Sequence, residues 1–423
     1  NNEKLKELYD EWTKRLKQIK EVQIPKLSDM ILDAEYSLSQ MDYKSTTYKI
    51  AKLEMELYKV RTSSDFLFGE IKDLTSSEER SRIIITGYKA RYRTLYEKYP
   101  NGQFSADSLY NLFLAKYLQK KYLDAQRLGH LHLKKFPDVK SSPAVTYYMG
   151  RIANKLKHYE SANLYYKQVI SKYPDTYYAF RANYNLYKDD GALPFDVLTP
   201  KPVVFPYKKS LENNLVIKLA LLKDYDLVEE LCKKDKFIQS WVAYQKGNYT
   251  ISAILARNAI AEMSVKPAFD DLRWRLAYPL HYFNIVEKNK GNNNEIILQS
   301  IIKEESHFNP LAKSCVGASG LMQLMPATYS DLAKSYGISG DIYNPESNIK
   351  AGSTYYSNLK KALNDKDLYA VSAYNGGIGS VKIWFSKLVY NDTDEFVEQI
   401  PYPETKNYVK KIFRTYWVYG NIY

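Results

Sequence analysis

The sequence predicts an all-α protein in which a curved array of helical repeats precedes a shorter helical segment and a C-terminal helical domain. Three observations support this class: a 37-residue repeat in the first half, a proline cluster near residue 200, and helical periodicity with weak strand signals throughout. A chain of 423 residues is long enough for two or three domains with buried cores. The expected domains are 1–207, 208–278 and 279–423.

The first of these domains contains the repeat. Three prolines, each after Lys and an aromatic residue, stand 37 residues apart: Pro100, Pro137 and Pro174. Tyr122 and Ala125 recur 37 residues later as Tyr159 and Ala162, and residues 246–253 carry a looser echo. This period is typical of tetratricopeptide-type helix–turn–helix units, which stack because each leaves an apolar face for its neighbour. The alternative is a set of unrelated amphipathic helices with chance spacing.

A proline-rich segment marks the main boundary. Pro194, Pro200, Pro202 and Pro206 fall within 13 residues, so residues 193–207 are expected to be extended. A shorter helical segment follows over 208–278. From Pro279 onward the chain is rich in glycine loops and turns. No run of 18 or more apolar residues occurs, so no segment is expected to span a membrane.

The positive charge of the chain is concentrated before Pro279. The chain carries a net charge of +13, but the part from Pro279 onward has 15 Lys and Arg against 14 Asp and Glu. The basic part could attract nucleic acid, anionic lipid headgroups or an acidic cell-wall polymer, or it could be a solvated surface without a partner. The 41 tyrosines suit helix packing, and also grooves that stack on sugar rings or bases.

Metal and redox chemistry are not expected. The two cysteines, Cys232 and Cys315, are read as free thiols because only folding could bring them together. The five histidines are scattered, and the sequence contains no His-Glu-x-x-His motif. We therefore predict no metal site and no cofactor.

Glu305 is the leading candidate for chemistry. At about 100° per residue, it projects into the apolar stripe of a helix, whereas Lys303 is expected to point away and Glu304 to lie at the edge. The stripe consists of Ile297, Leu298, Ile301 and Ile302.

The helix that carries Glu305 should end soon after it. Pro310 disfavours helical geometry in the residue before it, so the helix is expected to stop near residues 308–309. Burial and the negative end of the helix dipole both disfavour a charged carboxylate there, so the pKa of Glu305 should be raised. A carboxyl group that stays protonated near neutral pH suits a general acid. The alternative is an acid that bends out into water.

A glycine-rich phrase follows at residues 317–326 (Gly-Ala-Ser-Gly-Leu-Met-Gln-Leu-Met-Pro). Gly317 and Gly320 would let the backbone approach a ligand closely, and no Gly-Lys-Ser/Thr follows that would make a phosphate loop. Gln323 offers a donor and an acceptor, and Met325 offers an adaptable apolar contact. Alternatively, the Leu and Met residues of this phrase are core.

Two more phrases complete the set. Residues 373–377 (Ala-Tyr-Asn-Gly-Gly) end a helix, so Tyr374 either presents its hydroxyl to a cleft or belongs to an ordinary Asn/Gly helix end. Glu404 follows Pro403 at an expected helix start, where the helix dipole alone favours an acid.

Taken in order, the phrases at 305–310, 317–326, 373–377 and 400–409 resemble the catalytic domain of the soluble lytic transglycosylases. These are lysozyme-like enzymes that cleave bacterial peptidoglycan. The resemblance is most specific from about 296 to 410, and residues 276–280 look like the entry to that domain. It implies a curved helical-repeat superhelix over 1–207, a small helical linker domain over 208–278 and a lysozyme-like catalytic domain over 279–423.

The resemblance also implies residue roles, with Glu305 as the single catalytic acid and base. The positions that it implies as substrate contacts are Ser306, Phe308, Ser314, Gln323, Met325, Tyr374, Asn375 and Glu404. Cys315, where relatives often have Pro, departs from the family pattern, as do Glu304 and His307 beside the catalytic position.

The implied reaction cleaves the β-1,4 bond between N-acetylmuramic acid (MurNAc) and N-acetylglucosamine (GlcNAc) and leaves 1,6-anhydro-MurNAc ends. Glycosidases generally use two carboxylates, with exceptions that recruit the substrate. Only Glu404 accompanies Glu305 in the four phrases, so we expect help from the substrate N-acetyl group. The alternatives are a goose-type lysozyme-like hydrolase of the same bond and a non-catalytic helical-repeat scaffold that binds an acidic partner.

The expected partners are peptidoglycan glycan strands and not nucleic acid. The basic N-terminal part would grip their lactyl and peptide carboxylates, with peripheral association at the cell wall or outer membrane. The protein is expected to be monomeric and periplasmic, after removal of a signal peptide that is not present in a chain beginning at Asn1.

Overall fold

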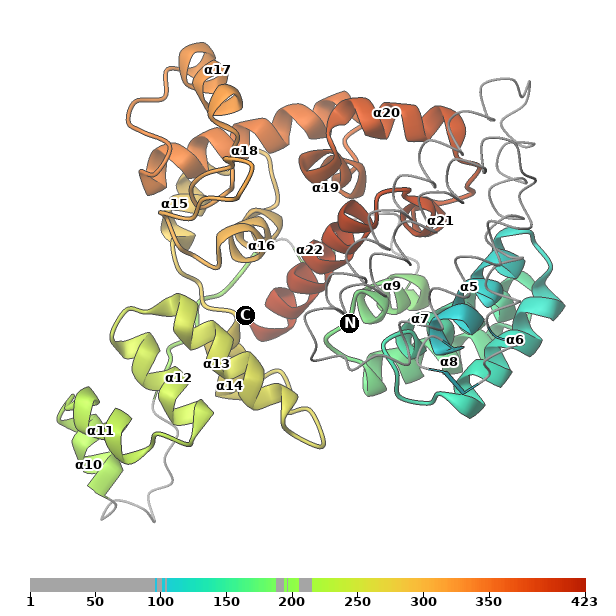
Figure 1. Cartoon of the computed structure of the whole chain (residues 1–423), viewed down its shortest axis with the longest axis horizontal. Helices are drawn as coiled ribbons and strands as arrows, with labels where there is room; N and C mark the ends of the chain where they lie inside the picture. Colours follow the sequence, from blue (N-terminus) through green and yellow to red (C-terminus); the bar gives the residue numbers. More distant parts are fainter. Residues whose placement is uncertain (1–95, 97–100, 103–104, 188–193, 196, 205–214) are drawn as a thin grey trace, which may run out of the picture. The chain divides into compact units, whose positions relative to one another are not determined.

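The structure is a computed structural model that describes residues 96, 101–102, 105–187, 194–195, 197–204 and 215–423 (Figure 1). These residues form helices, with only isolated bridges between Lys313, Ser319 and Leu324 and no β-strand. The predicted all-α class is confirmed. The chain divides into two compact units, one of 1–162 with 386–390 and one of 163–385 with 391–423. The domain boundaries at 207 and 278 stay predictions.

The repeat phrases lie at the turns of helical hairpins. Each phrase begins the second helix of a pair, and its alanine is buried: Ala125, Ala162 and Ala253. The phrases follow α5 (Ser105–Leu118), α7 (Ser142–Lys155) and α12 (Lys236–Gln245) and begin α6 (Tyr122–Lys135), α8 (Tyr159–Lys172) and α13 (Tyr249–Ala261); α6 packs on α5, and α13 packs on α12. Pro137 and Pro174 follow the second helices of the first two pairs, whereas Pro100 lies outside the described residues.

One turn geometry recurs in these hairpins. The residue two positions before the second helix has a positive φ, of 59° at Lys120, 64° at Lys157 and 78° at Gly247. The next N–H donates to a carbonyl five residues earlier, as from Asn248 to Ala243 at 2.8 Å. This is a Schellman closure of the first helix. Glycine adopts such a φ freely, whereas lysine does so at a cost in energy. Of these three turns, only the one at Gly247 could therefore be predicted from its residue type.

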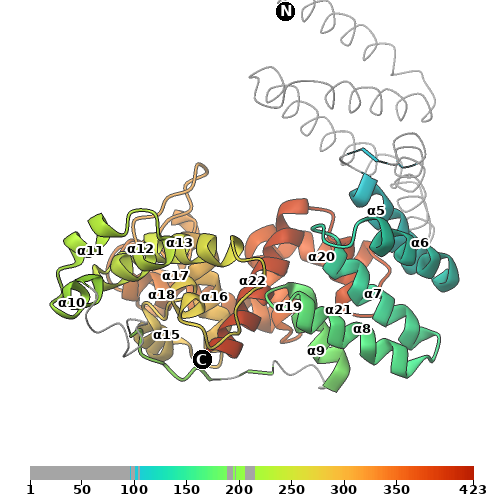
Figure 2. The same cartoon turned by 90° about the horizontal axis from the view of Figure 1, so that it is seen from below.

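The second unit is built around α16 (Glu295–Ser306), which packs along α22 (Pro403–Ile422) in both views (Figures 1 and 2). The Asn294 side chain accepts hydrogen bonds from the N–H groups of Ile296 and Ile297 and so starts α16. The other helices are α9 (Tyr177–Tyr187), α10 (Leu215–Leu221), α11 (Tyr225–Leu231), α14 (Leu272–Ala277), α15 (Phe283–Asn289), α17 (Pro326–Tyr336), α18 (Pro345–Ala362), α19 (Asp367–Gly376), α20 (Ile378–Lys387) and α21 (Thr393–Gln399).

Helix α16 is buried on every side, which corrects one prediction. Lys303 was expected to point away from the apolar stripe, yet its side chain is 1% exposed. The ammonium lies 4.3 Å from the ring centroid of Tyr278 and 3.3 Å from Glu304. The prediction was wrong because a stripe assumes a solvated opposite face, and α16 has none.

The described residues contain no helix long and apolar enough to cross a membrane.

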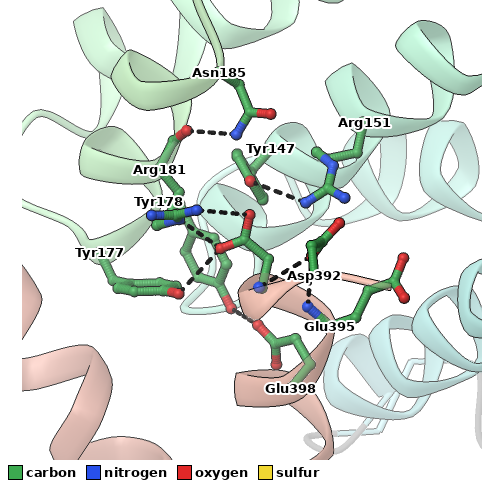
Figure 3. A network of polar contacts seen from close by, with 10 residues as sticks. Tyr147, Arg151, Tyr177, Tyr178, Arg181, Asn185, Asp392, Glu395 and Glu398 are labelled. Carbon is green, nitrogen blue, oxygen red and sulfur yellow. Dashed lines mark hydrogen bonds and ion pairs between the residues drawn. The ribbon is translucent and has the colours of Figure 1, made fainter. Parts of the chain in front are cut away.

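A buried ionic network joins α9 to α21 (Figure 3). The Arg181 guanidinium donates to both carboxylate oxygens of Asp394, at 2.5 and 3.3 Å, and the Tyr177 hydroxyl donates to the same carboxylate. Tyr178 and Lys410 hydrogen-bond to Glu398, so α22 is tied to the same assembly. Such forked charge pairs fix geometry as well as adding stability.

Breaking the fork from one side should destabilise the second unit. Asp394→Asn removes the carboxylate charge that pairs with the buried Arg181 guanidinium, so the free energy of unfolding is expected to fall by about 3–5 kcal/mol. Urea denaturation followed by circular dichroism measures it. The control is Glu346→Gln, at the exposed ion pair with Lys288, which should hardly move the unfolding midpoint. Equal effects of the two changes would contradict a structural role for the fork.

Candidate active site around Glu305

Glu305 lies in the last turn of α16, where the helix ends. The cap residue His307 and the following Phe308 have positive φ angles of 50° and 67°. The chain therefore turns sharply away just before Pro310, as the sequence predicts. The carboxylate Oε1 accepts a hydrogen bond of 2.7 Å from the hydroxyl of Tyr408, a residue of α22 that is 8% exposed.

The surroundings of Glu305 favour its protonated form. Burial raises its pKa to about 7; the hydrogen bond from Tyr408 acts against this shift, and the charges of Glu304 and Glu404 add to it. The charge of Lys411 lowers the pKa, and this effect is smaller than those of the two glutamates. The direction and the main cause agree with the expectation from the sequence. A group with this pKa can both donate and accept a proton near neutral pH.

The surroundings of Glu304, the adjacent acid, favour its charged form instead. Burial alone would raise its pKa, but the Lys303 ammonium, the Thr415 hydroxyl and Arg414 outweigh it and lower the pKa to about 2. Thr415 donates to its Oε1 at 2.6 Å. Two neighbouring carboxyl groups thus have pKa values pushed apart by their surroundings, which is the pattern that separates acid from anion in active sites.

Tyr374 approaches the same place from α19. Its hydroxyl donates to the carbonyl of Met322 at 2.8 Å, so its oxygen remains only as an acceptor toward a ligand. Burial raises its pKa well above the ordinary value, and the charge of Glu305 adds to this effect. Its ring centroid lies 5.3 Å from that of Tyr355.

The glycine-rich loop is held largely by its own contacts. Gly320 has a φ of 80°, and a Cβ there would lie 2.1 Å from the amide nitrogen of Asn348. Its glycine is therefore required by protein packing, whereas a Cβ at Gly317 would meet nothing within 4 Å. The Gln323 amide nitrogen donates to the carbonyls of Ala312 and Gly320 at 3.0 and 2.9 Å. A contact from Gln323 to a ligand would therefore use its oxygen.

Three more of the expected contact residues make hydrogen bonds inside the protein. Ser306 donates to the carbonyl of Ile302 at 3.0 Å, and Ser314 accepts from the N–H of Ala318 at 3.0 Å. The Asn375 oxygen accepts from the Thr405 hydroxyl at 2.7 Å, which ties the end of α19 to the start of α22. These contacts shape the site. Ser306 is also buried.

The remaining expected residues differ in exposure. Phe308 is buried, Met325 is 45% exposed, and Glu404 is exposed in the first turn of α22. Glu404 is close enough to Glu305 for its charge to raise the pKa of that carboxyl. The structure thus gathers Glu305, Tyr374 and Glu404 around one place, with Tyr408 between the helices.

Tyr408 is the residue that the sequence reasoning missed. It stands within the phrase at 400–409, but no role was assigned to it. On α22 it lies four residues after Glu404, so the two side chains share one face of the helix. That spacing was the available signal.

A surface cavity lies next to the end of α16. It has a volume of about 530 Å³ and is lined by 246–251, His281, Tyr282 and 308–310. Glu305 is not part of its wall, but Phe308, three residues later, is. The Thr250 hydroxyl donates to the carbonyl of His307 at 2.6 Å, so the turn between α12 and α13 touches the segment that follows Glu305.

The described part of the chain holds no group of three His, Cys, Asp or Glu residues that could bind a metal ion. Cys232 and Cys315 are both free, and Cys315 is exposed on the loop after Pro310.

Comparisons with known proteins agree with the resemblance carried by the four phrases. Residues 282–397 match the transglycosylase SLT domain family. The soluble lytic murein transglycosylases of Salmonella typhimurium and Escherichia coli K12 are 35% and 36% identical over 143 and 144 residues. Each alignment covers 32% of this chain and 22% of the relative, so the chain matches about a fifth of their length.

A solved structure extends the likeness of fold. An inactive mutant of the lytic transglycosylase Slt from Pseudomonas aeruginosa superposes with a TM-score of 0.59 at 19% identity. The superposition covers 94% of this chain and 66% of that one. The similarity of fold therefore reaches well beyond the segment that matches in sequence.

Removing the Tyr408 hydroxyl should move the titration of Glu305. The hydroxyl lowers the pKa of Glu305 from its buried value, so Tyr408→Phe should raise that pKa above about 7. ¹³C NMR of glutamate-labelled protein measures it, with the Glu305 signal identified by its loss in Glu305→Gln. The control is Tyr355→Phe, since Tyr355 contacts Tyr374 and makes no hydrogen bond to Glu305 among the described contacts.

Folding stability should follow the same titration. The folded state holds the proton of Glu305 more tightly than the unfolded chain does. Its contribution to stability is therefore complete below pH 4.5 and is lost as pH rises through about 7. In Tyr408→Phe the loss should extend to higher pH. A titration unchanged by Tyr408→Phe would contradict the hydrogen bond.

Proposed function

We propose that this chain, whose C-terminal part is similar to the soluble lytic murein transglycosylases, is itself a peptidoglycan lytic transglycosylase. It would cleave the β-1,4 bond between MurNAc and GlcNAc and leave 1,6-anhydro-MurNAc ends. The observation that carries the proposal is the single carboxyl group of Glu305, sheltered by α22 and with a pKa of about 7, at the start of the four ordered phrases.

In the first step Glu305 acts as the general acid. Its protonated carboxyl donates to the glycosidic oxygen, so the bond to C1 of MurNAc breaks as the GlcNAc hydroxyl leaves. The positive charge that develops at C1 is stabilised by the N-acetyl group of the same MurNAc. Tyr374 and Gln323 would orient the sugar through their oxygen atoms, which are the atoms left after their internal hydrogen bonds.

In the second step Glu305 acts as the general base. The carboxylate formed in the first step takes the proton of the MurNAc C6 hydroxyl, whose oxygen attacks C1 and closes the 1,6-anhydro ring. Proton balance is complete, because Glu305 ends the cycle protonated. A group that both gives and takes a proton needs a pKa near the working pH, as burial provides here.

The arrangement of the other acids supports substrate assistance. Retaining glycosidases with two carboxylates place the second one where it can attack C1. Glu304 is turned to Lys303 and Thr415, and Glu404 is an exposed residue at a helix start. Neither is placed as a buried nucleophile, so the N-acetyl group of the substrate is the better candidate for that role.

We further propose that glycan strands are bound beyond Glu305 as well. The cavity beside Phe308, with Tyr249 and Tyr282 in its wall, could accept a part of the strand next to the cleaved bond. The basic part of the chain before Pro279 would attract the lactyl and peptide carboxylates of the strand. Such a substrate places the protein at the cell wall, and a periplasmic location follows as part of the same proposal.

Glu305→Gln should abolish turnover while leaving binding intact. The amide keeps the shape of the side chain but can neither donate nor accept the proton. The rate of release of soluble fragments from purified peptidoglycan is expected to fall by at least about a hundredfold. Sedimentation with sacculi checks binding, and Glu346→Gln serves as the exposed control. Substantial activity of Glu305→Gln would refute the assignment.

Product masses decide between transglycosylation and the goose-type hydrolase. Mass spectrometry of the released muropeptides should find the anhydro form. A hydrolase would release fragments that are one water heavier.

Binding to sacculi should depend on salt if the basic part grips the strands. Raising the ionic strength from about 0.05 to 0.2 M screens exposed charges, so the bound fraction should fall several-fold. The scaffold alternative predicts instead a salt-sensitive complex with nucleic acid or an acidic protein, and no effect of Glu305→Gln on any activity.

A further inference from the structure

A buried charged cluster lies next to Glu305 along α16, and the proposed chemistry does not use it. The side chains of Lys303 and Glu304 are 1% and 11% exposed and form an ion pair at 3.3 Å. Thr415 of α22, buried in the same place, donates to Glu304 at 2.6 Å. The cluster therefore occupies the residues next to the proposed catalytic acid on the same helical turn.

Positive groups surround this single anion. The Lys303 ammonium lies over the ring of Tyr278, and Arg414 donates to the Tyr278 hydroxyl at 3.3 Å. Arg414 on α22 and Arg257 on α13 both act on Glu304. Without Glu304, the positive charges of Lys303, Arg414 and Arg257 would lose a carboxylate that balances them.

Packing alone does not explain a charged cluster here. Replacing a buried ion pair by apolar residues of similar volume is often neutral or stabilising, so stability is a weak reason to keep one. What an apolar pair could not supply is a permanent negative charge one residue from Glu305.

We propose that Glu304, held by Lys303 and Thr415, is a positioning residue that keeps a fixed negative charge beside Glu305 and thereby keeps Glu305 protonated until substrate is bound. The inference rests on the proposed function for its purpose, but the charge effect itself can be measured without any activity. Glu304 would touch neither the substrate nor the reacting atoms.

Other charged and titratable groups also face Glu305. From α22 come Tyr408, Glu404 and Lys411, and from α19 comes Tyr374, whose hydroxyl stays protonated. Of the two carboxylates, Glu404 is exposed, so solvent and salt screen it, whereas Glu304 is buried. Because the pKa of Glu304 is lowered to about 2, its charge is constant over any working pH. His307, the helix cap, also has a lowered pKa, mainly through burial.

The decisive variant is Glu304→Gln, which removes the charge and keeps an oxygen for Thr415. The pKa of Glu305 should fall by roughly one unit, since a like charge is lost and nearby cations are no longer balanced. The double variant Lys303→Met with Glu304→Gln removes one charge of each sign, so it should lower the pKa by less; it contains no unpaired lysine that could prevent folding. Thr415→Val removes the hydrogen bond but not the charge, and should leave the titration of Glu305 in place.

The measurement is the ¹³C NMR titration of Glu305 in glutamate-labelled full chain, assigned with Glu305→Gln. As a second readout, the alkaline limb of kcat/KM on peptidoglycan should move to lower pH by the same shift. A Glu305 signal that titrates at the unchanged pH in Glu304→Gln overturns the proposal. So does a shift in Thr415→Val equal to that in Glu304→Gln, because packing and not charge would then be responsible. A protein inactive on peptidoglycan would defeat the proposed function, while the titration would still decide this inference.

Discussion

The structure of the second unit depends on the burial of α16 on all sides. On a helix without a solvated face, polar side chains need partners inside the protein, because an unpaired buried polar group is costly. Gln299 donates to the carbonyl of His281, Ser300 to that of Ile296, and Lys303 pairs with Glu304. The surroundings of Glu305, in the last turn of this helix, favour the proton over the charge. Its chemistry is thus a consequence of where the helix lies.

Helix α22 supplies hydroxyl partners for the two carboxyl groups at the end of α16. Tyr408 reaches Glu305 and Thr415 reaches Glu304, seven residues apart along one helix face. The position of α22 is fixed in turn by Lys410 on Glu398, and by the stacking of Phe413 on Phe180 of α9 with ring centroids 5.6 Å apart. A change far from Glu305, such as one at the Arg181–Asp394 fork, can therefore alter the surroundings of Glu305 by shifting the position of α22.

The turn between α12 and α13 contacts the segment that follows Glu305. Thr250, next to the repeat tyrosine Tyr249, holds the carbonyl of His307, where the backbone turns through two residues with positive φ. Non-glycine residues in this conformation are uncommon and persist where surrounding contacts hold them. The same turn forms one wall of the cavity whose other wall contains Phe308. The segment before residue 279 is thus in direct contact with the segment that follows Glu305.

The sequence by itself determined the features that depend on near neighbours along the chain. Helical periodicity gave the all-α class, the repeat phrases located the hairpin turns, and Pro310 placed Glu305 in the last turn of its helix. The tertiary structure decided the partners. Tyr408 lies 103 residues from Glu305, Lys303 is buried against Tyr278, and the Gln323 nitrogen is bound within its own loop. Spacing within a few turns fixes the face on which a side chain stands, but only packing between distant segments fixes what covers that face.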